Sequence, residues 1–174
     1  MPVEPSVSLP GEVVRRVTPA KVACRFGCGG VAGCRHEQRN FVDSQSSIFA
    51  MISANWVLTD CLIAMARPAE PYLAELLPLM VRAGVGSVVN VQELEEHSHC
   101  GAILKSGFTY LPETIMRAGL SYYNFPTGDF GIWENRMLLQ IAKVLEGAQE
   151  QGAIAIHCHA GLGHAVVSYQ ILTF

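Results

Sequence analysis

The sequence predicts an α/β fold in which helices flank a mostly parallel central sheet. Short apolar runs of strand length occur at residues 56–60, 61–66, 87–92, 120–125 and 153–157, and segments with helical spacing separate several of them. The run AIAIH at 153–157 indicates a strand buried on both faces, which is typical of parallel sheets covered by helices on each side. Alternation of this kind predicts strand–helix–strand units.

Three segments have the spacing and end signals of helices. Pro71 opens the first, which runs through regularly spaced leucines to a stop at Gly84. The second is short, covers residues 112–119, and ends at Gly119. The third, residues 134–150, is ended by Gly152 and has one apolar face, formed by Met137, Leu138, Ile141, Val144, Leu145 and Ala148.

Length and composition fit one globular domain with a real core, since the chain has 174 residues, of which 50% are hydrophobic and 16% charged. The net charge of −3 gives no basic field for nucleic acid, and no apolar run reaches the roughly 18 residues that a membrane span needs. The N-terminus lacks the basic-then-apolar order of a secretory signal. We therefore expect a cytoplasmic protein without nucleic-acid or membrane partners; the sequence gives no sign of its oligomeric state.

The chain divides into an N-terminal segment, residues 1–48, expected to be partly disordered, and a regular domain, residues 49–174. Without a signal peptide, the six cysteines indicate thiols or metal ligands rather than disulfides. Four zinc-type ligands of the N-terminal segment have unusual spacings, so free thiols in a loop are the favoured interpretation: Cys24, Cys28, Cys34 and His36. A second group is an equally weak metal candidate, expected instead to fix a polar loop: His97, His99 and Cys100.

The segment HCHAGLGH, which begins with the last residue of the strand at 153–157, is the strongest functional candidate. Ligands of such sheets bind beyond the carboxyl ends of the strands, where the next helix presents free N–H groups. Gly161 and Gly163 let the backbone curl so that successive amides converge on an anion, and those amides would hold Cys158 as a thiolate. The alternative is a buried, inert cysteine followed by a simple turn.

The residues IHCHAGLG, ending at Gly163, resemble the signature H-C-x5-R-[ST] of protein tyrosine and dual-specificity phosphatases. Further segments are similar to the protein tyrosine phosphatase domain-containing protein 1 family, and the resemblance extends from Cys24 to Gly163. These segments are ARP at 66–68, SVVNVQ with EEHSHCG within 87–101, SGFTYLPE at 106–113, and YYNF followed by DFG within 122–131.

The resemblance implies hydrolysis of phosphotyrosine or phosphoserine/threonine on proteins through a cysteinyl-phosphate intermediate, with no metal or other cofactor. Cys158 would be the nucleophile and Asp129, in the Gly-flanked loop PTGDFG, the general acid; a solvated turn aspartate is the alternative. His157 would support the loop through a ring hydrogen bond, with a satisfied core histidine as the equal alternative. The implied phosphate-binding residues are His159, Ala160, Gly161, Leu162, Gly163 and His164.

The chain departs from the signature where the arginine should stand, because that position holds His164 and the next holds Ala165. A neutral imidazole cannot replace the two-pronged guanidinium, so we expect severely impaired activity. The chain also ends soon afterwards, so we expect a fold that is incomplete at the C-terminus. The alternatives are a catalytically dead phosphate-binding or interaction module and a non-functional truncated isoform.

Three further polar residues are weaker site candidates. Asp60 is expected in a tight connection between strands and Asp43 in a polar loop, so neither competes with Asp129. Arg67, in the ARP turn after a strand, could in principle reach an anion at the sheet edge, but an ion pair on the surface is the favoured interpretation.

Overall fold

The computed structural model describes residues 48–98, 102–128, 133–159 and 161. Five strands form one sheet: β1 (Ala54–Leu58), β2 (Leu62–Met65), β3 (Val85–Asn90), β4 (Ser121–Asn124) and β5 (Ala153–His157). The helices are α4 (Ile48–Met51), α5 (Glu70–Arg82), α6 (Pro112–Arg117) and α7 (Asn135–Gln149). Among the helices of these described residues, none is long and apolar enough to cross a membrane.

The strands lie in the order β1-β2-β5-β3-β4, so the last strand in sequence is the central one. β1 pairs antiparallel with β2, whereas β2, β5, β3 and β4 run parallel to one another. His157 at the end of β5 is in register with Met65 of β2 and Asn90 of β3. The predicted mostly parallel sheet is confirmed, and three strand ends meet at one place.

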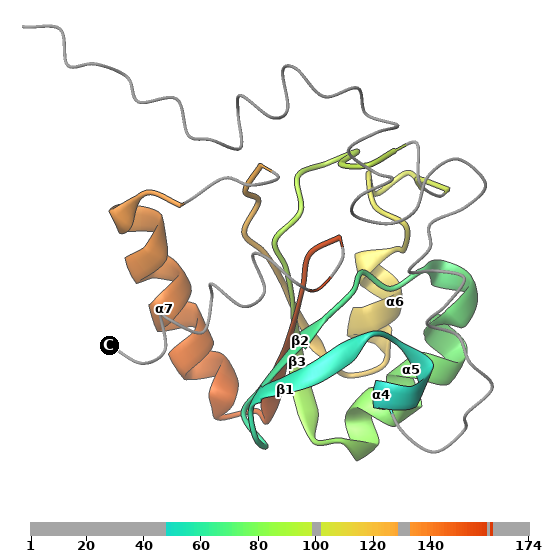
Figure 1. Ribbon diagram of the computed structural model, residues 1–174, viewed down its shortest axis with the longest axis horizontal. Coiled ribbons are helices and arrows are strands. Elements are labelled where there is room, and N and C mark those ends of the chain that lie inside the picture. The colour runs from blue at the N-terminus through green and yellow to red at the C-terminus, as the bar shows by residue number, and fades with distance from the viewer. Residues whose placement is uncertain (1–47, 99–101, 129–132, 160, 162–174) are drawn as a thin grey trace, which may run out of the picture.

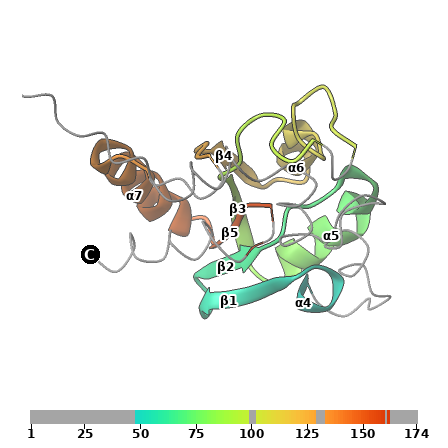
Figure 2. The same ribbon diagram turned by 45° about the horizontal axis from the view of Figure 1, so that its top comes forward.

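Helices cover both faces of the sheet, with α4, α5 and α6 on one side and α7 on the other (Figures 1 and 2). The side chains of β5 alternate between the two layers: Ala153 and Ala155 pack with the first three helices, and Ile154 and Ile156 pack with α7. All five residues of β5 are buried. This agrees with the prediction of a strand covered on both faces.

The predicted elements match the observed ones closely. Pro71 lies in the first turn of α5, and Gly84 follows it with φ +79°, as a helix stop of this kind requires. Gly119 does the same after α6 with φ +86°. The short helix α4 was not predicted; its first residue, Ile48, was assigned to the N-terminal segment and is buried in the core.

Candidate active site

Cys158 directly follows the central strand and is 7% exposed. Its Sγ accepts a hydrogen bond from the backbone N–H of Gly161 at 3.2 Å, so the chain turns back over the sulfur within three residues. Gly161 has φ +75°, and a Cβ at this position would lie 2.6 Å from the backbone N of Ala66. Both the conformation and the close approach to the end of β2 therefore require glycine.

The residues on either side of Cys158 are hydrogen-bonded to different neighbouring strands. The N–H of Val91, just beyond β3, donates to the carbonyl of His157 at 3.1 Å. The N–H of Arg67, just beyond β2, donates to the carbonyl of His159 at 3.3 Å. The nucleophile candidate is thus held between two backbone anchors, one from each adjacent strand.

His157 is fully buried, and its ring has a partner on each nitrogen. Nδ1 lies 3.4 Å from the carbonyl oxygen of Cys158, and Nε2 lies 2.7 Å from the hydroxyl of Tyr110. A carbonyl can only accept, so Nδ1 carries the proton and Nε2 accepts from the hydroxyl. Burial lowers the pKa of His157 from its ordinary 6.5 to about 3; the hydrogen bond to Cys158 opposes this shift and the charge of Arg67 adds to it. The ring is therefore neutral and contacts the backbone of Cys158.

A chain of polar contacts continues from Tyr110 to β3. The Tyr110 hydroxyl lies 3.2 Å from the Tyr122 hydroxyl, and the Tyr122 hydroxyl accepts a hydrogen bond from Asn90 Nδ2 at 3.0 Å. Burial raises the pKa of both tyrosines above the ordinary 10.0, so both hydroxyls keep their protons. Asn90 Oδ1 in turn accepts from the N–H of Gln92 at 2.8 Å. No pattern in the sequence indicates a role for these residues, although both tyrosines lie in segments that carry the family resemblance.

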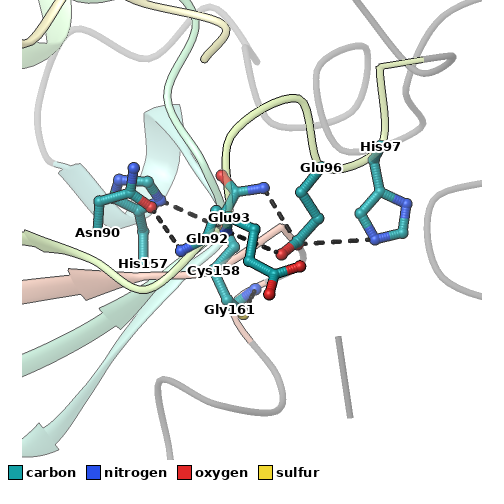
Figure 3. A network of polar contacts seen from close by, with 8 residues as sticks. All are labelled: Asn90, Gln92, Glu93, Glu96, His97, His157, Cys158 and Gly161. Atoms are coloured by element: carbon teal, nitrogen blue, oxygen red, sulfur yellow. Dashed lines mark hydrogen bonds and ion pairs between the residues drawn. The ribbon is translucent and has the colours of Figure 1, made fainter. Parts of the chain in front are cut away.

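The loop after β3 lies beside Cys158 (Figure 3). Glu96 accepts hydrogen bonds from Gln92 Nε2 at 3.3 Å and from the N–H of Glu93 at 3.2 Å. Glu96 Oε1 also lies 3.8 Å from His97 Nε2, which makes an ion pair when that ring is protonated. The His97 ring stacks on the ring of His159 with centroids 4.0 Å apart. His97 therefore contributes to a polar loop, as predicted.

The segment that leads to Asp129 begins at the same edge of the sheet. Thr127 is buried, and its N–H donates to the carbonyl of Val91 at 3.1 Å. On the far side of the segment, the indole of Trp133 donates to the carbonyl of Phe125 at 3.3 Å. Asp129 itself lies outside the described residues, but the residues on both sides of it are anchored close to the end of β3.

Curated proteins from vertebrates are similar to this chain over nearly its whole length. Protein tyrosine phosphatase domain-containing protein 1 of Mus musculus is 38% identical over 167 residues, which cover 94% of this chain and 22% of that protein. The proteins of the same name from Bos taurus and Danio rerio are 40% and 37% identical, covering 94% and 90% of this chain and 21% and 22% of their own lengths. The chain is similar to these protein tyrosine phosphatase domain-containing proteins over 90% or more of its length. It spans little more than one fifth of these relatives.

Solved phosphatase structures share the fold of this chain. Tk-PTP in its active form superposes with a TM-score of 0.51 at 22% identity, covering 68% of this chain and 74% of that chain. Kinase associated phosphatase with its catalytic site cysteine substituted by serine gives 0.50 at 17% identity, covering 66% and 68%. The predicted phosphatase-like α/β fold is confirmed. No model of a known protein family matches the chain.

The predicted site residues fall into two groups. The structure brings His157, Cys158, His159 and Gly161 together at the end of β5. Several lie outside the described residues: Cys24, Cys28, Cys34, His36, His99, Cys100, Asp129, Ala160, Leu162, Gly163 and His164. Within the described part of the chain, no group of three or more His, Cys, Asp or Glu side chains could hold a metal ion.

The structure also tests the interpretations given to Asp60 and Arg67. Asp60 lies in the turn between β1 and β2, with φ +60°, as a tight connection requires. The prediction of a surface ion pair for Arg67 is wrong, because this residue is only 3% exposed. It is buried because β2 is adjacent to β5, so the turn after β2 packs against the residues that follow β5 instead of facing water.

Proposed function

We propose that this site hydrolyses phosphate monoesters on proteins, with Cys158 as the nucleophile. The observation that carries the proposal is the Gly161 N–H, which donates to Cys158 Sγ at the carboxyl end of the central strand. Backbone amides that converge there favour an anion, first the thiolate and then the phosphoryl oxygens. A free thiol of this kind suits a reducing compartment, and we propose a cytoplasmic location.

The proposed reaction has two steps. In the first, the Cys158 thiolate attacks phosphorus, an S–P bond forms, the P–O bond to the protein breaks, and Asp129 gives its proton to the leaving oxygen. In the second, Asp129 takes a proton from water, the oxygen attacks phosphorus, the S–P bond breaks, and inorganic phosphate leaves. The position of Thr127 beside Val91 supports this role, because the loop of Asp129 starts next to the end of β5.

We further propose that this chain turns over slowly because His164 stands where the signature has arginine. A guanidinium binds two phosphoryl oxygens with a permanent charge, whereas a neutral imidazole offers one donor. Loss of one oxyanion donor costs about 10² to 10³ in rate in other enzymes, and a charged two-pronged donor should cost at least as much. Ala165 also removes the hydroxyl that the signature places next.

A second candidate is a phosphate-binding module without turnover. It is favoured by the same amide on Cys158 Sγ, because that hydrogen bond does not involve position 164. Such a module would bind phosphoproteins and release them unchanged. The two candidates share the binding site and differ only in the rate of the chemical step.

Hydrolysis of an aryl phosphate by the full 174-residue chain tests the proposal. We expect the double variant His164→Arg/Ala165→Thr to be at least about 10²-fold faster than the natural chain. Cys158→Ser should abolish hydrolysis in both backgrounds, and tungstate, an oxyanion mimic of phosphate, should inhibit both. A natural chain as fast as the double variant contradicts the role given to position 164. A double variant that binds tungstate but stays inactive supports the binding module.

A further inference from the structure

One pair of rings joins the loop after β3 to the phosphate loop. The imidazoles of His97 and His159 lie face to face, with centroids 4.0 Å apart and planes 19° from parallel. His159 directly follows Cys158 and is 5% exposed. The contact therefore fixes a side chain of the phosphate loop from a segment that is more than fifty residues away in sequence.

The turn that carries His97 has an unusual backbone. Glu95 and His97 have φ of +60° and +55°, in the left-handed region that non-glycine residues rarely adopt. Such conformations persist only where the surrounding structure holds them, and they occur preferentially near functional sites. Here the N–H of Glu95 donates to the carbonyl of Gly107 at 2.8 Å, which anchors the turn.

Glu96 holds the same turn from inside. Its carboxylate is 7% exposed and accepts hydrogen bonds from Gln92 Nε2 and the N–H of Glu93 (Figure 3). The backbone of Gln92 is bound to Asn90 Oδ1, so the turn is tied to the last residue of β3. These hydrogen bonds thus hold the loop after β3 in its conformation, and His97 lies at the end of the segment that they hold.

We infer that residues 92–97 form a brace that positions the phosphate loop, and that His97 is a positioning residue for the chemistry at Cys158. The inference rests on the proposed function, because it takes Cys158 as the reacting atom. His159 has its carbonyl fixed by the N–H of Arg67 and its ring fixed by His97. Because both the carbonyl and the ring of His159 are held, the backbone that follows His159 keeps a single direction. The Gly161 N–H therefore stays hydrogen-bonded to Cys158 Sγ.

Protection of Cys158 by tungstate tests the brace without requiring turnover. The full chain is treated with iodoacetamide, and peptide mass spectrometry measures the rate at which Cys158 is alkylated. The readout is the tungstate concentration that halves the alkylation rate of Cys158. Cys61 is the internal reference, because it lies between β1 and β2, at the opposite end of the sheet. Tungstate should protect Cys158 in the natural chain and leave Cys61 unaffected.

The variants are His97→Ala, His97→Phe and the matched control Ser98→Ala, which changes an exposed neighbour in the same loop. We expect His97→Ala to raise the half-protecting concentration about tenfold, since small displacements of a positioned group cost one to two orders of magnitude. His97→Phe should restore most of the protection, because a flat ring can still stack on His159. Should His97→Ala lose its cooperative melt, His97→Leu takes its place with the same expectation.

The outcomes separate the two proposals. If tungstate does not protect Cys158 in the natural chain, both the proposed function and the brace are contradicted. Protection in the natural chain that is unchanged in His97→Ala, as in the Ser98→Ala control, overturns the brace alone. Weakened protection that His97→Phe fails to restore overturns the stacking argument.

Discussion

Acidification should destabilise this protein through His157, whose buried ring has a pKa lowered to about 3 from the ordinary 6.5. Below pH 6.5 the unfolded chain takes up a proton at this residue and the folded chain does not. The free energy of unfolding therefore decreases as the pH is lowered, until the pKa of the folded state is reached. Each pH unit in that window costs about 1.4 kcal/mol. Between about pH 7.5 and about pH 5, His157 should therefore remove about 2 kcal/mol from the free energy of unfolding.

The variant His157→Gln tests this value, since an amide can still donate to the carbonyl of Cys158 and accept from Tyr110 but does not titrate. Urea unfolding at the two pH values gives the pH-dependent loss of stability for each protein. The loss in His157→Gln should be smaller than in the natural chain by about 2 kcal/mol, whatever the variant costs at neutral pH. Ser98→Ala should keep the full loss. An equal loss in His157→Gln and the natural chain would refute the reasoning.

Three further changes test single contacts. Gly161→Ala places a Cβ 2.6 Å from the backbone at the end of β2 and should abolish tungstate protection of the nucleophile; unchanged protection would contradict the close approach. Tyr110→Phe leaves Nε2 of His157 buried without its 2.7 Å donor and should lower the free energy of unfolding by about 1–3 kcal/mol in urea. Glu70→Ala removes two 2.7 Å hydrogen bonds between α5 and the start of α6 and should cost about 2 kcal/mol, whereas the exposed Glu75→Ala should change little.

The fold was largely predictable because its signals are local. The strand predicted at 153–157 has the same bounds as β5, and the helix predicted at 134–150 corresponds to α7. Apolar spacing fixes the type of each element, and glycines such as Gly84 and Gly119 fix the ends. The same rule predicts a ligand-binding loop directly after β5, since a glycine-rich turn after a buried parallel strand lies at the ligand-binding edge, and phosphate binding by that loop stays a prediction.

The supporting residues were not predictable in this way, because their partners are distant in sequence. The ring of His157 meets a tyrosine 47 residues earlier, and no periodicity indicates that pair. Arg67 looked like a surface residue of a short turn, and it is buried only because β5 inserts between β2 and β3. His97 stood in a group of weak metal candidates, and its contact is a ring stack instead. The roles given to Asp129 and His164 stay predictions.

The geometry separates two requirements that the phosphatase signature combines in one short loop. The sulfur of Cys158 is positioned by anchors from both neighbouring strands, through the carbonyls of His157 and His159. None of these anchors involves position 164, so under the proposed function a histidine at that position leaves them intact. In the proposed function, what His164 cannot supply is the charged donor to the phosphoryl oxygens. Reactivity of the thiol toward iodoacetamide therefore reports on the first requirement, and hydrolysis reports on the second. A change confined to position 164 should alter hydrolysis far more than the alkylation rate of Cys158.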